Sequence, residues 1–347
     1  MPATAIDMFF ACTLMVTVAL VATAFLAGTI QVQIENTQNL NQESYLRSIA
    51  DNLVKNFGSP TDWGSTNSKP TNLGLSATTG TSLYTLDVDK ITRFNTQNTY
   101  ALSYVDALSA AKIDNIAVNI CISQMLSIDT KLLYSNLVDD STAYTFEVTI
   151  SQDTGTVSAN LHCYALAQGT QVDVFNSTTN DGVSSVTVEI PNSASGPAIL
   201  VVFAQASFDE RFCAYTVHKF THSSIEPEET GKYLNLSPLD NELNINLMSP
   251  QANVGQVFAC SYNYSAILTS ASSNKYVIPD FVDNSPIVII AEGFNETTYF
   301  NEWVAYPQVP FTFGSNLANS STNAFSYIVN IKDVLYKFTI KLGDVSY

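Results

Sequence analysis

The sequence predicts an α+β fold that is mainly β: a long N-terminal α-helix, a small mixed segment, and two tandem immunoglobulin-like β-sandwiches. Three observations support this fold class. An uncharged apolar run fills residues 8–30, apolar and polar residues alternate from about residue 140, and short motifs recur about 90 to 100 residues apart. These features divide the chain into residues 1–57, 58–139, 140–225 and 226–347.

The composition limits the classes of function. The 347 residues include 14 Lys and Arg against 31 Asp and Glu, so the net charge of −17 reflects scarce bases rather than many acids. Ser, Thr and Asn number 36, 35 and 30 and supply most of the polar surface. Because phosphate binding needs clustered Lys and Arg, no nucleic-acid partner is expected. A hydrophobic content of 46% argues against disorder.

The apolar run reads MFFACTLMVTVALVATAFLAGTI. A helix of this length spans about 34 Å, enough to cross a hydrocarbon core of about 30 Å. Two alternatives stay open. Ala22-Thr-Ala24 imitates a signal-peptide cleavage site, although no Lys or Arg precedes Arg47. A buried core helix is the other alternative, but it would be unusually long and apolar on all sides.

The helix is expected to continue beyond the apolar run. Apolar residues keep a rough helical spacing from Ile30 to Phe57, and no Pro or Gly interrupts the chain before Gly58-Ser-Pro60. A single helix from about residue 5 to residue 57 would be about 80 Å long. Its second half is amphipathic, which is more than a simple membrane anchor requires.

Four short motifs follow this helix. They are Gly58-Ser-Pro60-Thr-Asp-Trp63-Gly64, Leu73-Gly74-Leu75, Leu86-Asp87-x-Asp89-Lys90-Ile91 and Tyr100-Ala-Leu-Ser-Tyr104-Val-Asp-Ala-Leu108. Together with the helix, over roughly residues 5–122, they resemble the type IV pilin-like surface proteins of archaea. The resemblance implies a hydrophobic helix that sits in the membrane and later packs as the core of a filament. It also implies a β-rich domain outside the cell.

Asp7 precedes the apolar run directly. Type IV pilins carry an acidic residue at the fifth mature position, and the resemblance implies that Asp7 fills this place in a chain that begins at Ala3. There it would help neighbouring subunits to pair. The sequence departs from the family pattern because it lacks the basic leader and small residue that a prepilin peptidase reads. The alternative role for Asp7 is that of an ordinary acid stabilised by the dipole of a helix N-terminus.

The rest of the chain is expected to be mixed at first and then β. A helix is predicted over residues 100–112 and a strand over residues 116–122. Strands with a period of two follow, for example at residues 144–150 and 185–190. The final hairpin, residues 325–331 and 335–342, is expected to close the second sandwich.

An internal repeat is the reason for predicting two sandwiches. Three pairs of motifs recur in the same order: Gly155-Thr-Val157 with Gly255-Gln-Val257, Ile190-Pro191 with Ile278-Pro279, and Ala214-Tyr215 with Ala305-Tyr306. Short strands separated by turn residues favour an antiparallel sandwich for each half.

The cysteines suggest one disulfide. Cys12 lies in the apolar run, where it is expected to pack as a small residue. Cys163 and Cys213 are 50 residues apart, fall on predicted strands of the first sandwich, and are placed on inward faces where they could form an inter-sheet bridge. The alternative is two buried free thiols, since no Trp lies on a strand between them.

The sequence indicates no catalytic or metal-binding residue, and no cofactor is expected. His218 and His222, followed by several glutamates, have the spacing of a helical metal pair but lie on a predicted strand and loop. Calcium at Asp87-x-Asp89 or Asp139-Asp140 lacks the spacing of an EF-hand. No nucleophile elbow or glycine-rich phosphate loop occurs, so the protein is predicted not to be an enzyme.

Five N-glycosylation sequons all fall within the two predicted sandwiches. They begin at Asn176, Asn235, Asn263, Asn295 and Asn319. Their number matches random expectation, so they are candidate acceptors for an exported protein and no more.

Two hypotheses follow, and both place the protein at the cell surface. In the first, it is the structural subunit of a pilus-like filament, with self-association through the N-terminal helix after a stage in the membrane. In the second, it is a single-pass surface adhesin whose sandwiches bind a glycan or a protein partner. A secreted enzyme acting on polysaccharides is the least favoured alternative.

Overall fold

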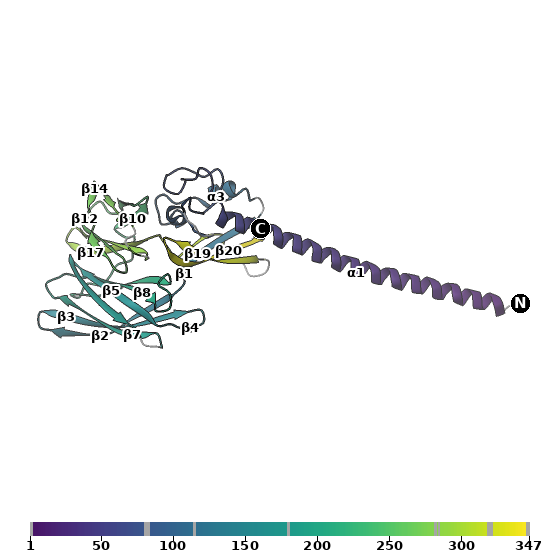
Figure 1. Ribbon diagram of the computed structural model, residues 1–347, viewed down its shortest axis with the longest axis horizontal. Helices are drawn as coiled ribbons and strands as arrows, with labels where there is room; N and C mark the ends of the chain where they lie inside the picture. The colour runs from purple at the N-terminus through teal and green to yellow at the C-terminus, as the bar shows by residue number, and fades with distance from the viewer. Residues whose placement is uncertain are drawn as a thin grey trace. The chain divides into compact units, whose positions relative to one another are not determined.

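The computed structural model describes residues 3–79, 84–113, 116–178, 181–280, 283, 285–317 and 322–344. The chain separates into two compact units, Met1–Asp51 and Asn52–Tyr347. As predicted, the fold is α+β and mainly β, with an N-terminal helix and several antiparallel sheets (Figure 1).

The N-terminal helix α1 is continuous over Ala3–Lys55. The prediction of one long helix is therefore confirmed, with both ends two residues earlier than expected. The helix stops just before Gly58, whose φ of +75° is outside the helical region and suits glycine.

The second unit contains a head built from residues 52–124 and 307–344. Its short helices are α2 (Val88–Thr92) and α3 (Tyr104–Ala111). Its sheet has the strand order β18-β1-β20-β19. The bounds are β18 (Phe311–Gly314), β1 (Ile116–Gln124), β20 (Val334–Asp344) and β19 (Thr322–Ile331). Phe94, next to α2, stacks on Phe311 and meets Phe313 edge-on, so aromatic packing joins the helical side to the sheet.

The first module, residues 127–220, consists of two sheets. One sheet has the order β2-β3-β4 with β7 also paired to β3, and the other has the order β6-β5-β8-β9. The bounds are β2 (Ser127–Val138), β3 (Ser141–Gln152), β4 (Gly155–Thr156), β5 (Ala159–Ala167), β6 (Thr170–Ser177), β7 (Val183–Pro191), β8 (Ala198–Ala206) and β9 (Cys213–Phe220).

The second module, residues 234–306, also consists of two sheets, with the orders β10-β11-β15-β14 and β13-β12-β16-β17. The bounds of its first four strands are β10 (Leu234–Leu239), β11 (Glu242–Leu247), β12 (Ala252–Cys260) and β13 (Ser265–Ile267). Those of the last four are β14 (Ser270–Ser272), β15 (Lys275–Val277), β16 (Ile287–Asn295) and β17 (Thr298–Tyr306).

The two modules share one topology. The order β6-β5-β8-β9 in the first corresponds to β13-β12-β16-β17 in the second, and the pairings β2-β3-β7 correspond to β10-β11-β15. Two of the three motif pairs lie on matching strands or at their ends: Ile190-Pro191 ends β7 and Ile278-Pro279 follows β15, while Ala214-Tyr215 lies on β9 and Ala305-Tyr306 on β17. The first pair does not match, because Gly155 lies in β4 and Gly255 lies within β12, which corresponds to β5. The shared strand order is a duplicated arrangement of seven strands.

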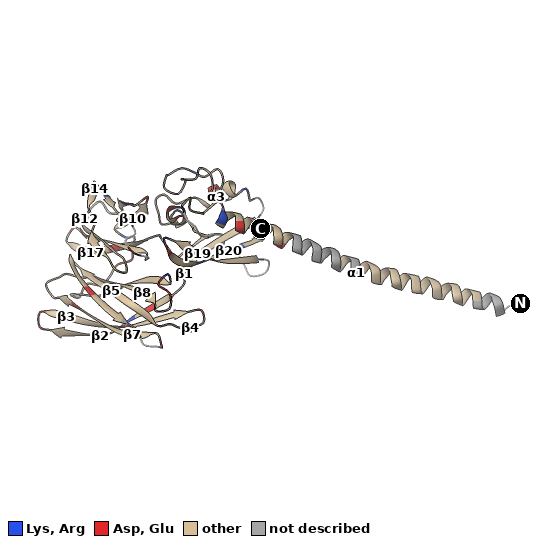
Figure 2. Ribbon diagram, in the orientation of Figure 1, with Lys and Arg blue, Asp and Glu red and all other residues tan. Residues whose placement is uncertain are grey.

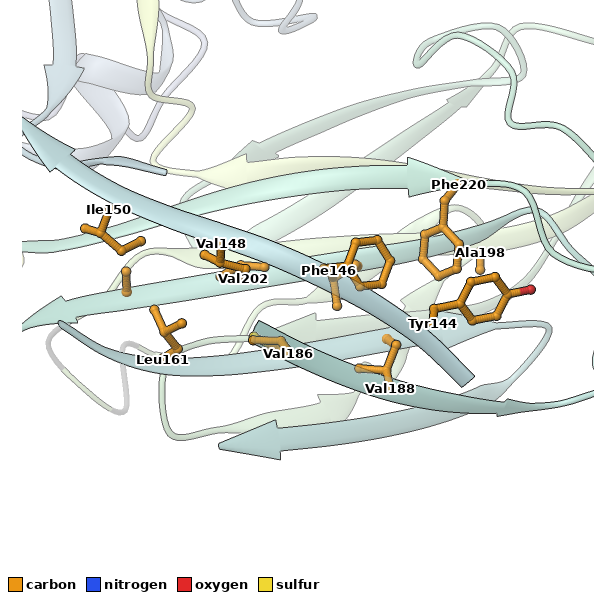
Figure 3. Packing of buried hydrophobic residues seen from close by; sticks show 14 of the residues in the cluster. Tyr144, Phe146, Val148, Ile150, Leu161, Val186, Val188, Ala198, Val202 and Phe220 are labelled. Carbon is orange, nitrogen blue, oxygen red and sulfur yellow. The ribbon is translucent and has the colours of Figure 1, made fainter. Parts of the chain in front are cut away.

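An apolar core joins the two sheets of the first module (Figure 3). Phe146 and Val148 of β3 and Val186 of β7 meet Val202 of β8 and Phe220 of β9, and each of the five is at most 4% exposed. Burying one such side chain contributes about 1.5–3 kcal/mol. The period-two alternation of β3 and β7 in the sequence comes from this one-sided burial.

The central strands β5 and β8 of the sheet β6-β5-β8-β9 are buried on both faces. In β8, Val202 faces the core of the first module, while Phe203 faces the other way and contacts Tyr215 of β9. Tyr215 in turn contacts Trp303 of β17 at a ring-centroid distance of 6.4 Å. The two modules therefore pack sheet against sheet. Because both faces of β8 are buried, its sequence is apolar almost throughout and does not alternate.

The C-terminal hairpin lies elsewhere than expected. It does not close the second module, because β20 pairs with β1 from Ile116↔Asp344 to Gln124↔Tyr336, and β18 pairs with the other edge of β1. The alternation within the hairpin identifies two strands but not their partner. Likewise, β2 pairs with β3, so the first module begins near residue 127 and not at residue 140.

Candidate functional site

The apolar part of α1 is the most distinctive candidate for a functional surface. Met8–Thr29 is long and apolar enough to cross a membrane, and none of it is buried within the chain. Phe9, Met15 and Phe25 are 68%, 79% and 73% exposed. Figure 2 shows no acidic or basic residue along this stretch. Such a surface is unfavourable in water, and its length and composition fit a membrane anchor or a signal sequence.

The polar side chains within this segment are satisfied locally. The hydroxyls of Thr13, Thr17, Thr23 and Thr29 each donate to carbonyl oxygens three and four residues earlier, at 2.9–3.2 Å. Because these hydroxyls need no external partner, they can enter a dry environment at small cost. Cys12 is also exposed here. Asp7 lies within the bounds of α1, but its side chain is outside the described residues.

The first motif residues after α1 form a tight turn. The indole N–H of Trp63, which is completely buried, donates to the carbonyl of Gly74 at 3.1 Å. A Cβ at Gly74 would come within 3.0 Å of the carbonyl oxygen of Asn56 and the nitrogen of Gly58. These glycines are therefore needed for close approach of backbone segments.

Two buried bases complete this turn. The Lys90 ammonium donates to the carbonyls of Phe57 and Ser76 at 2.9 Å each, and the Arg93 guanidinium donates to the carbonyls of Trp63 and Thr66. Burial lowers the pKa of both side chains. The motif residues thus have structural partners in the backbone.

Asp89 joins the head to the second module. Its carboxylate accepts from the Tyr306 hydroxyl of β17 at 2.7 Å and from the backbone N–H of Asp240 at 2.9 Å. Burial raises the pKa of Asp89, and the neighbouring Asp87 and Asp240 act in the same direction. Asp87 accepts from the backbone N–H groups of Asp89 and Lys90 and so caps α2.

A second polar joint lies beside Asp89. The Asn98 side chain donates to the Gln308 side chain at 2.6 Å and to the carbonyl of Pro238 at 3.0 Å, and all of Asn98 is buried. Thr99 bonds to the Ser237 hydroxyl at 2.9 Å. Buried polar groups with several partners fix one relative arrangement, because moving the parts would leave those groups unpaired.

Gln124 joins the head to the first module. Its side-chain amide donates to the carbonyl of Tyr215 at 3.1 Å and accepts from the N–H of the same residue at 2.7 Å. The Tyr215 hydroxyl donates to the carbonyl of Val309, just before β18. One tyrosine of β9 therefore contacts both strands that lead into and out of the head.

The two modules are also joined directly. The Glu292 carboxylate of β16 accepts from the N–H of Gly169 at 2.7 Å, and the Tyr299 hydroxyl accepts from the N–H of Gln168 at 2.8 Å. The Asn301 side chain donates to the carbonyl of Pro197 at 2.8 Å. Head, first module and second module thus form one unit through buried polar contacts at each of the three boundaries.

The predicted disulfide is contradicted. Cys163 and Cys213 are free and lie in the same sheet, on β5 and β9, with β8 between them. Cys163 pairs with Val202 and belongs to the module core, whereas Cys213 pairs with Gln205 and points to the opposite face. Burial raises the pKa of both thiols, so neither is reactive. The alternative of two buried free thiols describes this structure.

The histidine pair has structural partners. His222 is buried and its Nδ1 lies 2.8 Å from the Tyr144 hydroxyl. His218 lies in β9 and packs against Phe146. Within the described residues, no group of three or more His, Cys, Asp or Glu side chains is placed to hold a metal ion.

The sequons differ in accessibility. Asn176 is exposed on the edge strand β6, Asn263 is exposed in the turn after β12, and Asn295 ends β16 at a hairpin turn. Asn235 is half-buried, and the hydroxyl of its sequon residue Ser237 is fully buried against Thr99. Asn319 lies outside the described residues. The structure therefore favours Asn176, Asn263 and Asn295 as acceptors over Asn235.

Sequence reasoning singled out the motif residues but missed the joints. Gln124 and Glu292 carry no local pattern that distinguishes them from other strand residues, and Tyr215 stands out only as part of the repeated motif Ala214-Tyr215. Comparison with families of known proteins finds no matching family. A comparison with curated proteins likewise finds no match.

Proposed function

We propose that this chain is the structural subunit of an extracellular pilus-like filament. In this proposal, copies of the apolar segment of α1 pack together in the filament core after a stage in the membrane, and the β-rich body lies outside. The observation that carries the proposal is the exposure of the whole apolar segment on a helix of 53 residues. A helix needs only about 20 residues to cross a bilayer. A simple membrane anchor would therefore not need most of the second half of α1.

The second unit supports a structural role. Buried hydrogen bonds join its three parts, and a subunit that packs repeatedly along a filament benefits from a single fixed shape. We also propose that both modules are immunoglobulin-like sandwiches. Their seven shared strands, which pair in groups of three and four, are the feature that supports this assignment; in the first module β4 also joins the group of three.

The competing hypothesis is a lone membrane-anchored surface protein, which would present the same helix to lipid. The two differ in what surrounds the small residues of the apolar segment. Lipid tolerates a larger apolar side chain, whereas a packed helix interface that relies on close approach does not. Enlarging these residues therefore separates the hypotheses without adding a charge.

The test replaces, one at a time, each small residue of the segment by Leu. The positions are Ala11, Ala19, Ala22, Ala24, Ala27 and Gly28. We expect a subset on one helix face to abolish filaments in electron micrographs of sheared cells, since overpacking costs about 1–3 kcal/mol per contact. Membrane insertion should stay unchanged in all six variants, and Val16→Ile is the matched control. Absence of the wild-type protein from sheared filaments would reject the proposal.

A further inference from the structure

A cavity of about 500 Å³ lies where the head and both modules meet. Its walls come from the end of β1, the start of β2, the edge strand β9, and residues Trp303 and Pro310. This volume falls within the range of small-molecule sites, which run from about 300 to 1,000 Å³. The cavity belongs entirely to the second unit and is independent of α1.

The frame of the cavity is fixed by the contacts of Gln124 and Tyr215. The side chain of Gln124 hydrogen-bonds to both the N–H and the carbonyl of Tyr215. These two peptide groups of Tyr215 therefore point away from the neighbouring strand β8. Residues two apart on an antiparallel strand direct their peptide groups to the same side. The N–H and carbonyl of Val217, which also lines the cavity, therefore point to the free edge of β9.

The side chains that line the cavity are uncharged, and they form one apolar wall and one polar wall. No Asp, Glu, Lys, Arg or His occurs among the described residues that form the walls. Trp303 is half-buried and, with Pro310, supplies a rigid apolar surface. Ser123 and Ser127 supply hydroxyls. An ion would find no counter-charge here, so the fitting ligand is neutral.

We infer that this cavity is a binding site for a neutral carbohydrate. A pyranose ring has an apolar C–H face and an edge of hydroxyls, which matches an aromatic wall beside serine hydroxyls and free strand-edge peptide groups. The inference does not rest on filament assembly, because every lining residue lies in the second unit.

The two tryptophans provide a direct test. The full-length protein is labelled with 5-fluorotryptophan and held in a zwitterionic detergent, because sugar-headed detergents would compete. The probes are the methyl glycosides of glucose, galactose, mannose and N-acetylglucosamine, with glucuronate as the charged comparison. Trp63 is fully buried with its N–H bonded to Gly74, so it serves as the internal reference.

We expect at least one neutral glycoside to shift the Trp303 fluorine resonance saturably while the Trp63 resonance stays in place, and glucuronate to have no effect. Saturation-transfer NMR on the sugar should then show that Trp303→Leu abolishes binding. Ser127→Ala should weaken binding about threefold to tenfold, as the loss of one neutral hydrogen bond does. Ser326→Ala, on the exposed face of β19, is the matched control and should leave binding unchanged.

Three outcomes would overturn the inference. They are no shift at Trp303 with any neutral glycoside, equal shifts at both tryptophans, or undiminished sugar binding by Trp303→Leu. Folding of each variant is checked by the unchanged position of the Trp63 resonance, or by circular dichroism. A failure here would leave the filament proposal untouched.

Discussion

At the scale of single residues, the body relies on buried polar side chains that bond to the backbone. Asp89 is 8% exposed and bonds to a tyrosine hydroxyl and a peptide N–H of the second module. Lys90 bonds to two carbonyls and Arg93 to several. Each such group would be costly if left unpaired, so these residues specify the arrangement more than they add stability.

The charge on Asp89 gives a pH-dependent prediction. Burial raises its pKa in the folded protein, so the folded state binds the proton more tightly than the unfolded chain. Stability from this group is therefore greatest below the ordinary carboxyl pKa and falls as the pH rises through the folded-state value. Asp89→Asn keeps an oxygen that can accept from Tyr306 and Asp240 and removes the ionisation.

We expect Asp89→Asn to be more stable than wild type at pH 7 and equal to it near pH 4, as measured by thermal unfolding at both values. Asp139→Asn, at an exposed turn, is the matched control and should show no such difference. A variant that is less stable at pH 7 would mean that the ionised carboxylate is required at the joint.

Local patterns predicted many of these residues as important without revealing what they contact. The motifs from Gly58 to Leu108 were visible because they contain Gly, Pro, Trp and charged residues in short runs. Their partners, such as Tyr306 for Asp89, lie more than 200 residues away. The prediction of a disulfide was wrong for a related reason. The alternation of a strand shows which residues share a face of its sheet. It does not show which of the two faces packs against the second sheet of the module.

At the scale of elements, the strands and helices themselves were largely predictable. The 53-residue helix, the strand β1 and the alternating strands β3 and β7 follow from apolar periodicity and breakers. Pairing partners were not predictable. The hairpin β19-β20 has the same alternation whether it closes the second module or pairs with β1, because only contacts distant in sequence distinguish the two.

The contact between Gln124 of β1 and Tyr215 of β9, which connects two strands of different sheets, can be tested directly. The Gln124 amide occupies the edge of β9 in the way a neighbouring strand would, and so links β1 to the first module. Gln124→Ala leaves the peptide groups of Tyr215 without this partner. We expect a loss of about 1–3 kcal/mol in unfolding free energy. Amide exchange at Tyr215 should also be faster.

Gln205→Ala is the matched control, since the Gln205 side chain of β8 makes an exposed bond to the carbonyl of Glu210 in the turn before β9. It should change stability by less than about 0.5 kcal/mol. If both variants behaved alike, the amide of Gln124 would not be a specific joint.

At the scale of the whole molecule, the two modules are an insertion in the head. The central strand β1 lies between β18 and β20, yet β18 follows β1 only after both modules. Ile122 of β1 pairs with Phe311 of β18, so the chain leaves the head and returns at neighbouring positions. Such an arrangement lets the modules vary while the head and its helix are retained.

Excising the insertion tests this description. Replacing residues 124–309 by Asn-Gly would connect Ser123 to Pro310 through a two-residue turn of the type that suits an antiparallel hairpin. We expect the shortened protein to fold, because the sheet β18-β1-β20-β19 and the turn around Trp63 remain intact. Its melting temperature should be lower, because Asp89 and Asn98 lose their partners Tyr306 and Gln308.

The measurement is cooperative thermal unfolding together with amide protection of β1. The matched control deletes residues 116–309, which removes β1 as well and should not fold, since β18 and β20 would lose the strand between them. If the filament proposal holds, the shortened protein should still assemble, into thinner filaments, because α1 and the head are unchanged. A shortened protein without protected amides in β1 would show instead that the modules are required to fold the head.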